Sequence, residues 1–169
     1  MRRGLATVSA IALCSVLGLG APAFGQATQE RLNNADSEPE NWLIPYQNYS
    51  SHRFSRLDEI NRDNVGDLRV AFAFSLDDPL RGDTNDNQSP ILVDNGIAWV
   101  EAHSGMLYRL DLTSGKDAVL VWKADSGVDP EEGVRTRGFA MYEDSLVQNL
   151  IDGRVVRVDE VLDERVLVH

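Results

Sequence analysis

The stretch from Ser89 to Trp122 constrains the fold of this chain most, because it alternates short apolar runs with turn signals. Asp94-Asn95-Gly96 separates the first two runs, and Asn and Gly tolerate the positive φ that a tight hairpin requires. Two later turns, His103-Ser104-Gly105 and Thr113-Ser114-Gly115-Lys116, separate the remaining runs. Four short runs in succession predict one antiparallel meander of four strands, over about residues 88–124.

A weaker copy of the same pattern follows over residues 138–169. Tyr108-Arg109-Leu110-Asp111 aligns with Val156-Arg157-Val158-Asp159 at an offset of 48 residues, a period typical of propeller blades. A single meander leaves one apolar face uncovered, so it needs a second sheet or further copies of itself. The sequence therefore predicts an all-β chain built from repeated four-stranded sheets.

The first 25 residues have the features of a secretory signal peptide. Arg2 and Arg3 precede an apolar run from Leu5 to Leu19, and small residues follow it. The alternative, a membrane span, is disfavoured because this run is shorter than the ~20 apolar residues that a spanning helix needs. Cys14 lies inside this segment, so the mature chain would have no cysteine and no disulfide. We therefore expect an exported protein with no membrane span after signal cleavage.

The remaining chain is acidic. The sequence has 27 acidic and 16 basic residues, and its formal net charge is −11. This balance disfavours nucleic acid and anionic membranes as partners, because both recruit proteins through basic patches. Residues 26–40 are polar and aperiodic, which predicts a linker. Residues 41–169 then form the folded domain.

Two patterns precede the first meander. Asn61 to Val65 predicts a short helical turn capped by the Asn61 side chain. Leu68 to Leu76 alternates apolar and small or polar residues, which predicts an additional strand.

The loop between this strand and the meander contains Asp83, Asn85 and Asn87, at the spacing of a calcium loop. The sixth position of the loop is Gln88, where calcium loops need Gly. A solvated loop is therefore the favoured interpretation.

Taken together, these residues resemble the mature start of the pyrroloquinoline-quinone (PQQ)-dependent alcohol dehydrogenases, over most of residues 41–159. The residues that carry the resemblance are Trp42, Tyr49, Arg53-Phe54-Ser55, Leu57, Ile60-Asn61, Asn64-Val65, Leu68, Val70-Ala71-Phe72, Phe74-Ser75-Leu76, Ser89 to Gly96, Leu107 to Asp111, Ser114-Gly115-Lys116 and Arg137-Gly138.

The resemblance implies the first two or so W-shaped four-stranded blades of an eight-bladed, quinoprotein-type β-propeller, which these residues leave incomplete. It implies PQQ as cofactor, with a calcium ion near the propeller axis. It also implies that Trp122 docks between neighbouring blades. Trp122 comes six residues after Lys116, later than in the family, so we expect a small insertion to be looped out there.

Two residues match the family's cofactor-binding positions. Arg137 matches the arginine of an Asn-Arg-Gly motif that meets the polar edge of the quinone, and the alternative is a surface arginine. Asn87 stands where the family usually has a glutamate that touches the cofactor. Other departures are Glu131-Glu132, in place of a vicinal cysteine pair, and Leu150, in place of a hydroxyl.

The family's calcium ligands and its catalytic aspartate lie in later blades. We therefore assign no catalytic and no metal-binding residue here, and Asp111, Asp152 and Asp159 are not given such roles. The resemblance implies a portion of a periplasmic enzyme that oxidises a small alcohol and passes the electrons to PQQ. This portion is expected to be inactive alone, and its partners would be the remaining blades or copies of itself. Whether it acts as an enzyme is left open, because the alternative is a non-catalytic periplasmic propeller-repeat protein that binds another protein.

Overall fold

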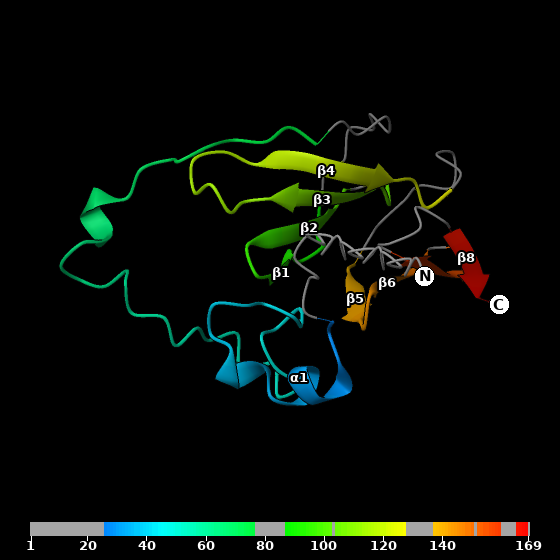
Figure 1. The fold of residues 1–169 in the computed structure, drawn as a ribbon, viewed down its shortest axis with the longest axis horizontal. Helices are drawn as coiled ribbons and strands as arrows, with labels where there is room; N and C mark the ends of the chain where they lie inside the picture. Colours follow the sequence, from blue (N-terminus) through cyan, green and yellow to red (C-terminus); the bar gives the residue numbers. More distant parts are fainter. Residues whose placement is uncertain are drawn as a thin grey trace, which may run out of the picture.

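A computed structural model of the chain describes residues 26–76, 87–102, 104–127, 137–150, 152–159 and 165–168. The predicted signal peptide, most of the loop that resembles a calcium site and Glu131-Glu132 lie outside these residues. Two antiparallel sheets of four strands each dominate the described part (Figure 1). None of the helices in that part has the length and apolar character needed to cross a bilayer.

The first sheet is the predicted meander. It consists of β1 (Leu92–Asp94), β2 (Ile97–Glu101), β3 (Leu107–Asp111) and β4 (Val119–Ala124), which pair in sequence order. Asn95 and Gly96 form the first turn, with φ of 49° and 77°. These are the positive φ values that the turn sequence predicts.

The second sheet repeats the first with the predicted offset. It consists of β5 (Phe139–Tyr142), β6 (Ser145–Asn149), β7 (Val155–Asp159) and β8 (Arg165–Val168), again in sequence order. Asp94 pairs with Ile97 in the first sheet, and Tyr142 pairs with Ser145 in the second. The 48-residue period is thus confirmed by the strand register.

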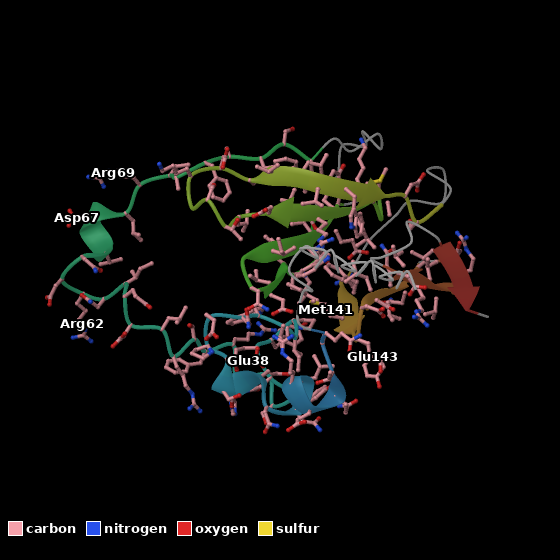
Figure 2. The ribbon with its side chains drawn as sticks, in the orientation of Figure 1. Glu38, Arg62, Asp67, Arg69, Met141 and Glu143 are labelled. Atoms are coloured by element: carbon pink, nitrogen blue, oxygen red, sulfur yellow. The ribbon has the colours of Figure 1, made fainter. Side chains whose placement is uncertain are left out.

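The main apolar core lies between the two sheets. Both sheets contribute buried side chains to it, and Met141 is seen there in Figure 2. The buried members from the sheets are Leu92, Ile97, Trp99, Leu107, Phe139, Met141, Leu146, Val156 and Val158. Full burial of Trp99 alone contributes about 4–6 kcal/mol, at ~25 cal/mol per Å² of apolar surface.

Trp122 packs against this core from β4 and is partly buried, as expected for a tryptophan between neighbouring blades. Trp122 pairs with Arg109, whereas Leu120 pairs with the next residue, Leu110. Val121 is therefore an extra residue in a β-bulge, and Trp122 still packs against the core.

The opposite face of the first sheet carries a smaller apolar cluster. Its buried residues are Ala98, Val100, Ala102, Tyr108 and Leu110. Phe74 packs against this cluster, with its ring edge-on to Tyr108 at a centroid distance of 6.4 Å. Chain that precedes β1 therefore covers part of this face.

Residues 26–40, which were expected to be a linker, are folded instead. They contain α1 (Gln29–Asn33) and the 3-10 turn η1 (Ala35–Ser37), whose Leu32 and Ala35 are buried. Backbone bridges join Ala27 to Glu143 and Trp42 to Val93, so residues 26–50 form a cap against both sheets (Figure 1). A five-residue helix is too short to show a 3.6-residue period, so the sequence pattern could not reveal it.

The strand predicted over 68–76 is not formed. These residues are extended but belong to neither sheet, and Val70 is 86% exposed. The turn before them is confirmed, since the Asn61 side chain accepts a hydrogen bond from the Asp63 backbone, ahead of η2 (Val65–Asp67). Figure 2 shows Arg62, Asp67 and Arg69 on this segment, well away from the sheets.

An ion-pair cluster of Arg31, Glu38 and Asp94 links the cap to the turn between β1 and β2. The Arg31 guanidinium donates to both oxygens of Asp94, at 3.0 and 2.7 Å, and to both oxygens of Glu38. Asp94 is 1% exposed. Asn41 accepts from the Asn95 backbone and donates to Glu38, so the same cluster also orders the turn.

Replacement of Arg31 by Ala should lower the free energy of unfolding by about 3 kcal/mol, because it leaves the buried Asp94 carboxylate without its counter-charge. Replacement of Arg56, an exposed arginine that lies 3.9 Å from Asp36, should cost less than about 0.5 kcal/mol. Urea unfolding of both variants measures the difference. Equal losses would show that the Arg31 cluster does not hold the cap.

The stabilising effect of Glu38 should depend on pH. The hydrogen bonds from Arg31 lower the pKa of Glu38 below its ordinary value of 4.5. Its contribution is therefore complete above pH 4.5 and is lost as the pH falls through the lower folded-state pKa. The difference in unfolding free energy between wild type and Glu38→Gln, measured in urea from pH 7 to pH 3, should shrink toward zero. A difference that stays constant would contradict this assignment.

Candidate functional site

The two predicted cofactor contacts, Asn87 and Arg137, lie on equivalent connections of the two sheets. Asn87 precedes β1, the first strand of its sheet, and Arg137 precedes β5, the first strand of the other. Both residues are exposed. The opposite end of β1, at Asp94, contacts the cap, so the two residues occupy the end of the sheets away from the cap.

A close approach of two backbone segments brings these connections together. Gly138 follows Arg137 and has a φ of +119°, and a Cβ placed on it would lie 3.1 Å from Cδ of Pro90. Only glycine adopts this conformation readily and leaves room for the proline. The structure thus joins segments 87–90 and 137–138, although they are far apart in the sequence.

The two side chains offer hydrogen-bond donors in different ways. The Asn87 side-chain oxygen accepts from the Ser89 backbone at 3.1 Å, so its amide nitrogen is the group suited to meet a ligand. Arg137 presents a guanidinium, whose fork of donors matches carboxylate and carbonyl oxygens. The site is therefore suited to an anionic, oxygen-rich molecule.

Glu101, which the sequence analysis did not identify, lies directly beneath this site. It ends β2, is 0% exposed, and accepts hydrogen bonds from the Gly138 backbone at 3.1 Å and from the Gln148 amide. Burial raises the pKa of Glu101, and hydrogen bonds from Ser89, Gln148 and Gly138 partly oppose that rise. A signal was present in the sequence: Ile97, Trp99 and Glu101 alternate onto one face, and the first two are core residues.

The other residues that the sequence analysis weighed, Leu150 and three aspartates, contact neighbouring groups of the protein. Leu150, which stands in place of the family's hydroxyl, is 6% exposed and packs in the main core. Asp111 accepts from Thr113, Asp152 from Arg154, and Asp159 from Ser145 and Arg157. Within the described residues, no group of three or more His, Cys, Asp and Glu side chains is arranged to hold a metal ion.

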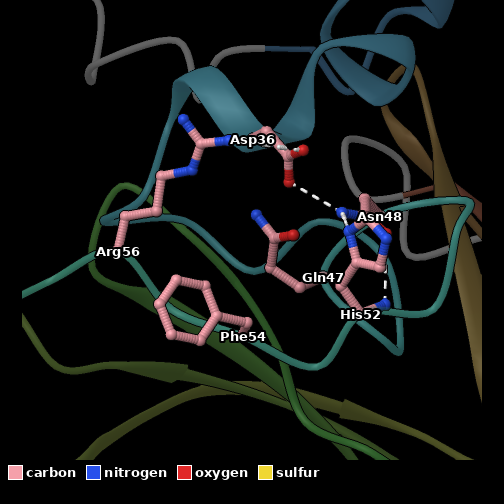
Figure 3. A pocket seen from close by; sticks show the side chains of 6 residues that line it. All are labelled: Asp36, Gln47, Asn48, His52, Phe54 and Arg56. Carbon is pink, nitrogen blue, oxygen red and sulfur yellow. Dashed lines mark hydrogen bonds and ion pairs between the residues drawn. The ribbon is translucent and has the colours of Figure 1, made fainter.

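A pocket of about 200 Å³ opens on the cap rather than at this site (Figure 3). The Asn48 amide bridges its polar wall, donating to Asp36 at 2.8 Å and lying 3.0 Å from Nδ1 of His52. The hydrogen bond from Asn48 lowers the pKa of Asp36. Because neither Asn87 nor Arg137 lines this pocket, it is separate from the candidate site.

Comparison with known proteins identifies the relatives of the chain. Residues 42–164 match the family model described as the PQQ glucose/ethanol/alcohol dehydrogenase β-propeller domain. The dehydrogenase subunit of a quinone alcohol dehydrogenase from Acetobacter aceti is 34% identical over 155 residues, which cover 86% of this chain and 20% of that protein. The quinohemoprotein alcohol dehydrogenase ADH-IIG of Pseudomonas putida is 28% identical and matches 96% of this chain and 22% of its own length.

Solved structures agree with this result. The structure of the quinohemoprotein alcohol dehydrogenase ADHIIG from Pseudomonas putida superposes with a TM-score of 0.75 at 27% identity, covering 88% of this chain and 22% of that one. A europium-containing methanol dehydrogenase superposes with a TM-score of 0.68 at 26% identity, covering 80% of this chain and 24% of that one. The chain thus spans about a fifth of the length of the curated relatives it matches. With its repeated four-stranded sheets and this match over residues 42–164, the chain belongs to the PQQ β-propeller domain family of glucose, ethanol and alcohol dehydrogenases.

Proposed function

We propose that the chain forms the first sheets of an eight-bladed propeller in a PQQ-dependent alcohol dehydrogenase of the periplasm. Its share of the enzyme is part of the wall that binds the cofactor, and the substrate of the whole enzyme is a small alcohol. The family membership and the match to about a fifth of each relative support this proposal.

The observation that carries the proposal is the contact between Gly138 and Pro90, which sets Asn87 and Arg137 on adjoining connections. PQQ is an anionic quinone with carboxylate and carbonyl oxygens, so an arginine and an amide donor fit its polar edge. When bound, PQQ supplies the redox chemistry by accepting two electrons from the alcohol. The role of this chain is to bind and orient the polar edge of the quinone through Arg137 and Asn87.

The chain by itself should bind PQQ only weakly and should not oxidise alcohols. One charge-assisted arginine contact contributes ~1.5–3 kcal/mol and one neutral amide contact about 1 kcal/mol, which together reach at most the ~4 kcal/mol of millimolar affinity. The calcium ligands and the general base that removes the alcohol proton are assigned to other blades of the complete propeller. Activity therefore depends on those blades.

Titration of the ¹⁵N-labelled chain with PQQ tests the cofactor site. We expect fast-exchange shifts of the Arg137, Gly138 and Asn87 resonances, with an affinity near the millimolar range. Arg137→Ala should abolish these shifts. Arg69→Ala, which removes an exposed arginine far from the site, should leave them unchanged.

Two results would refute the cofactor site: unperturbed Arg137 and Asn87 resonances at about 5 mM PQQ, or identical shifts in Arg137→Ala. Oxidation of ethanol by the isolated chain with PQQ and calcium would refute the proposed dependence on other blades.

A second candidate function is protein binding without catalysis. It is favoured by the segment 54–76, which pairs with neither sheet and is rich in exposed apolar side chains, such as Leu57, Ile60, Leu68 and Val70. Such a segment can add a strand to the sheet of a partner or of a second copy of the chain.

Light scattering on the purified chain tests this second function. We expect association into dimers or larger species, which the double substitution Leu68→Asp and Val70→Asp should reduce because it places charges on the apolar side of the segment. Ser114→Asp, on an exposed turn of the first sheet, is the matched control. A monomer at all concentrations would rule out binding between copies through this segment.

A further inference from the structure

Glu101 is placed to link the two connections that carry the candidate site. One of its carboxylate oxygens, Oε2, accepts from the Gly138 backbone N–H at 3.1 Å. The Ser89 side chain lies near the same carboxylate and lowers its pKa, while its hydroxyl donates to the Pro90 carbonyl at 3.5 Å. Gly138 adjoins Arg137, and the Ser89 backbone is bonded to the Asn87 side chain. A single buried carboxylate therefore reaches both sides of the site.

The second oxygen of Glu101 is held from the neighbouring sheet. Oε1 accepts from the Gln148 amide, which also donates to the Gly105 carbonyl at 3.0 Å. Gln148 is 0% exposed, and the turn at Gly105 packs so closely that a Cβ there would lie 2.6 Å from Oγ of Ser126. The carboxylate cannot swing away without breaking contacts in both sheets.

The chemistry of these contacts requires a carboxylate or a close analogue. A carboxylate is acceptor-only and has two oxygens, so it can receive the Gly138 and Gln148 donors together. An apolar residue of the same size would leave these buried donors without acceptors, which costs free energy. The donors could find new acceptors only if the connections moved. Hydrogen bonding at Glu101 thus favours the approach of Gly138 to Pro90.

We propose that Glu101 is a positioning residue, which holds Gly138 against Pro90 so that Asn87 and Arg137 face one anionic quinone together. Glu101 does not touch the ligand; it acts through the two connections. The identity of the ligand rests on the proposed function, whereas the fixed spacing of the connections does not.

The spacing can be measured without any ligand. In the wild-type chain, the nuclear Overhauser effect between the Gly138 Hα and Pro90 Hδ protons should be strong. It should be lost in Glu101→Ala and retained in Glu101→Gln, whose side chain still has an oxygen for the Gly138 N–H. Arg31→Lys, which perturbs the cap at the other end of β1, should retain it and serves as the control for general loss of stability.

Titration with PQQ then tests the consequence for binding. We expect affinity for PQQ to fall about tenfold in Glu101→Ala and by no more than about threefold in Glu101→Gln. Because Glu101 does not touch the ligand, this loss would come from reduced preorganisation of the site. If Glu101→Ala does not fold, Ser89→Ala removes a single contact and should weaken both the Overhauser effect and PQQ affinity by about threefold.

The outcomes separate the two proposals. Absence of PQQ binding in the wild type would refute the cofactor role, while loss of the Overhauser effect in Glu101→Ala would still establish the link between the connections. An unchanged Overhauser effect and unchanged affinity in Glu101→Ala, or in Ser89→Ala where the first variant does not fold, would overturn the positioning role. Loss of the effect in Arg31→Lys would overturn it as well.

Discussion

The apolar face that each four-stranded sheet must remove from water is the constraint on which the rest of this structure depends. Trp99 in the first sheet and Met141 in the second both face the shared core. A single meander cannot cover its own apolar face, so each of the two sheets covers that face of the other. Their face-to-face packing then determines which loops meet at the edges of the core.

Polar groups at the end of this core do what apolar packing cannot. Hydrophobic contact is non-directional, so it can bring two sheets together without specifying the relative placement of their loops. Hydrogen bonds to the buried Glu101 carboxylate are directional, and they join Gly138 and Gln148 of the second sheet to β2 of the first. These buried hydrogen bonds thus help to position the connections that carry the candidate site.

The cap plays a related part at the other end of β1. Arg31 of α1 contacts Asp94 through both of its terminal nitrogens, and Trp42 pairs with Val93 along the open edge of β1. The pairing of Trp42 with Val93 occupies backbone groups that would otherwise remain unpaired at a sheet edge. In contrast, segment 54–76 pairs with neither sheet and keeps exposed apolar residues such as Leu68 and Val70.

Much of the architecture was predictable from local pattern. Turn residues such as Asn95-Gly96 marked the hairpins, alternation marked the strands, and the Tyr108–Val156 alignment gave the repeat, because each of these signals depends on neighbours in the chain. The motif around Arg137 likewise pointed to one half of the candidate site. The extended segment at Leu68 shows the limit of such reasoning: its alternation is that of a strand, but a strand exists only where another strand pairs with it.

The sequence by itself determined the four-stranded repeat and its period, and its resemblance to a family suggested the two cofactor-contact candidates. Only the tertiary structure decided that residues 26–40 fold as a cap, that Asn87 and Arg137 lie on adjoining connections, and that Glu101 joins them. Those features arise from contacts between residues distant in the chain, such as Arg31 with Asp94 and Glu101 with Gly138. A short-range pattern carries no record of them, because the partners meet only after the apolar faces have packed.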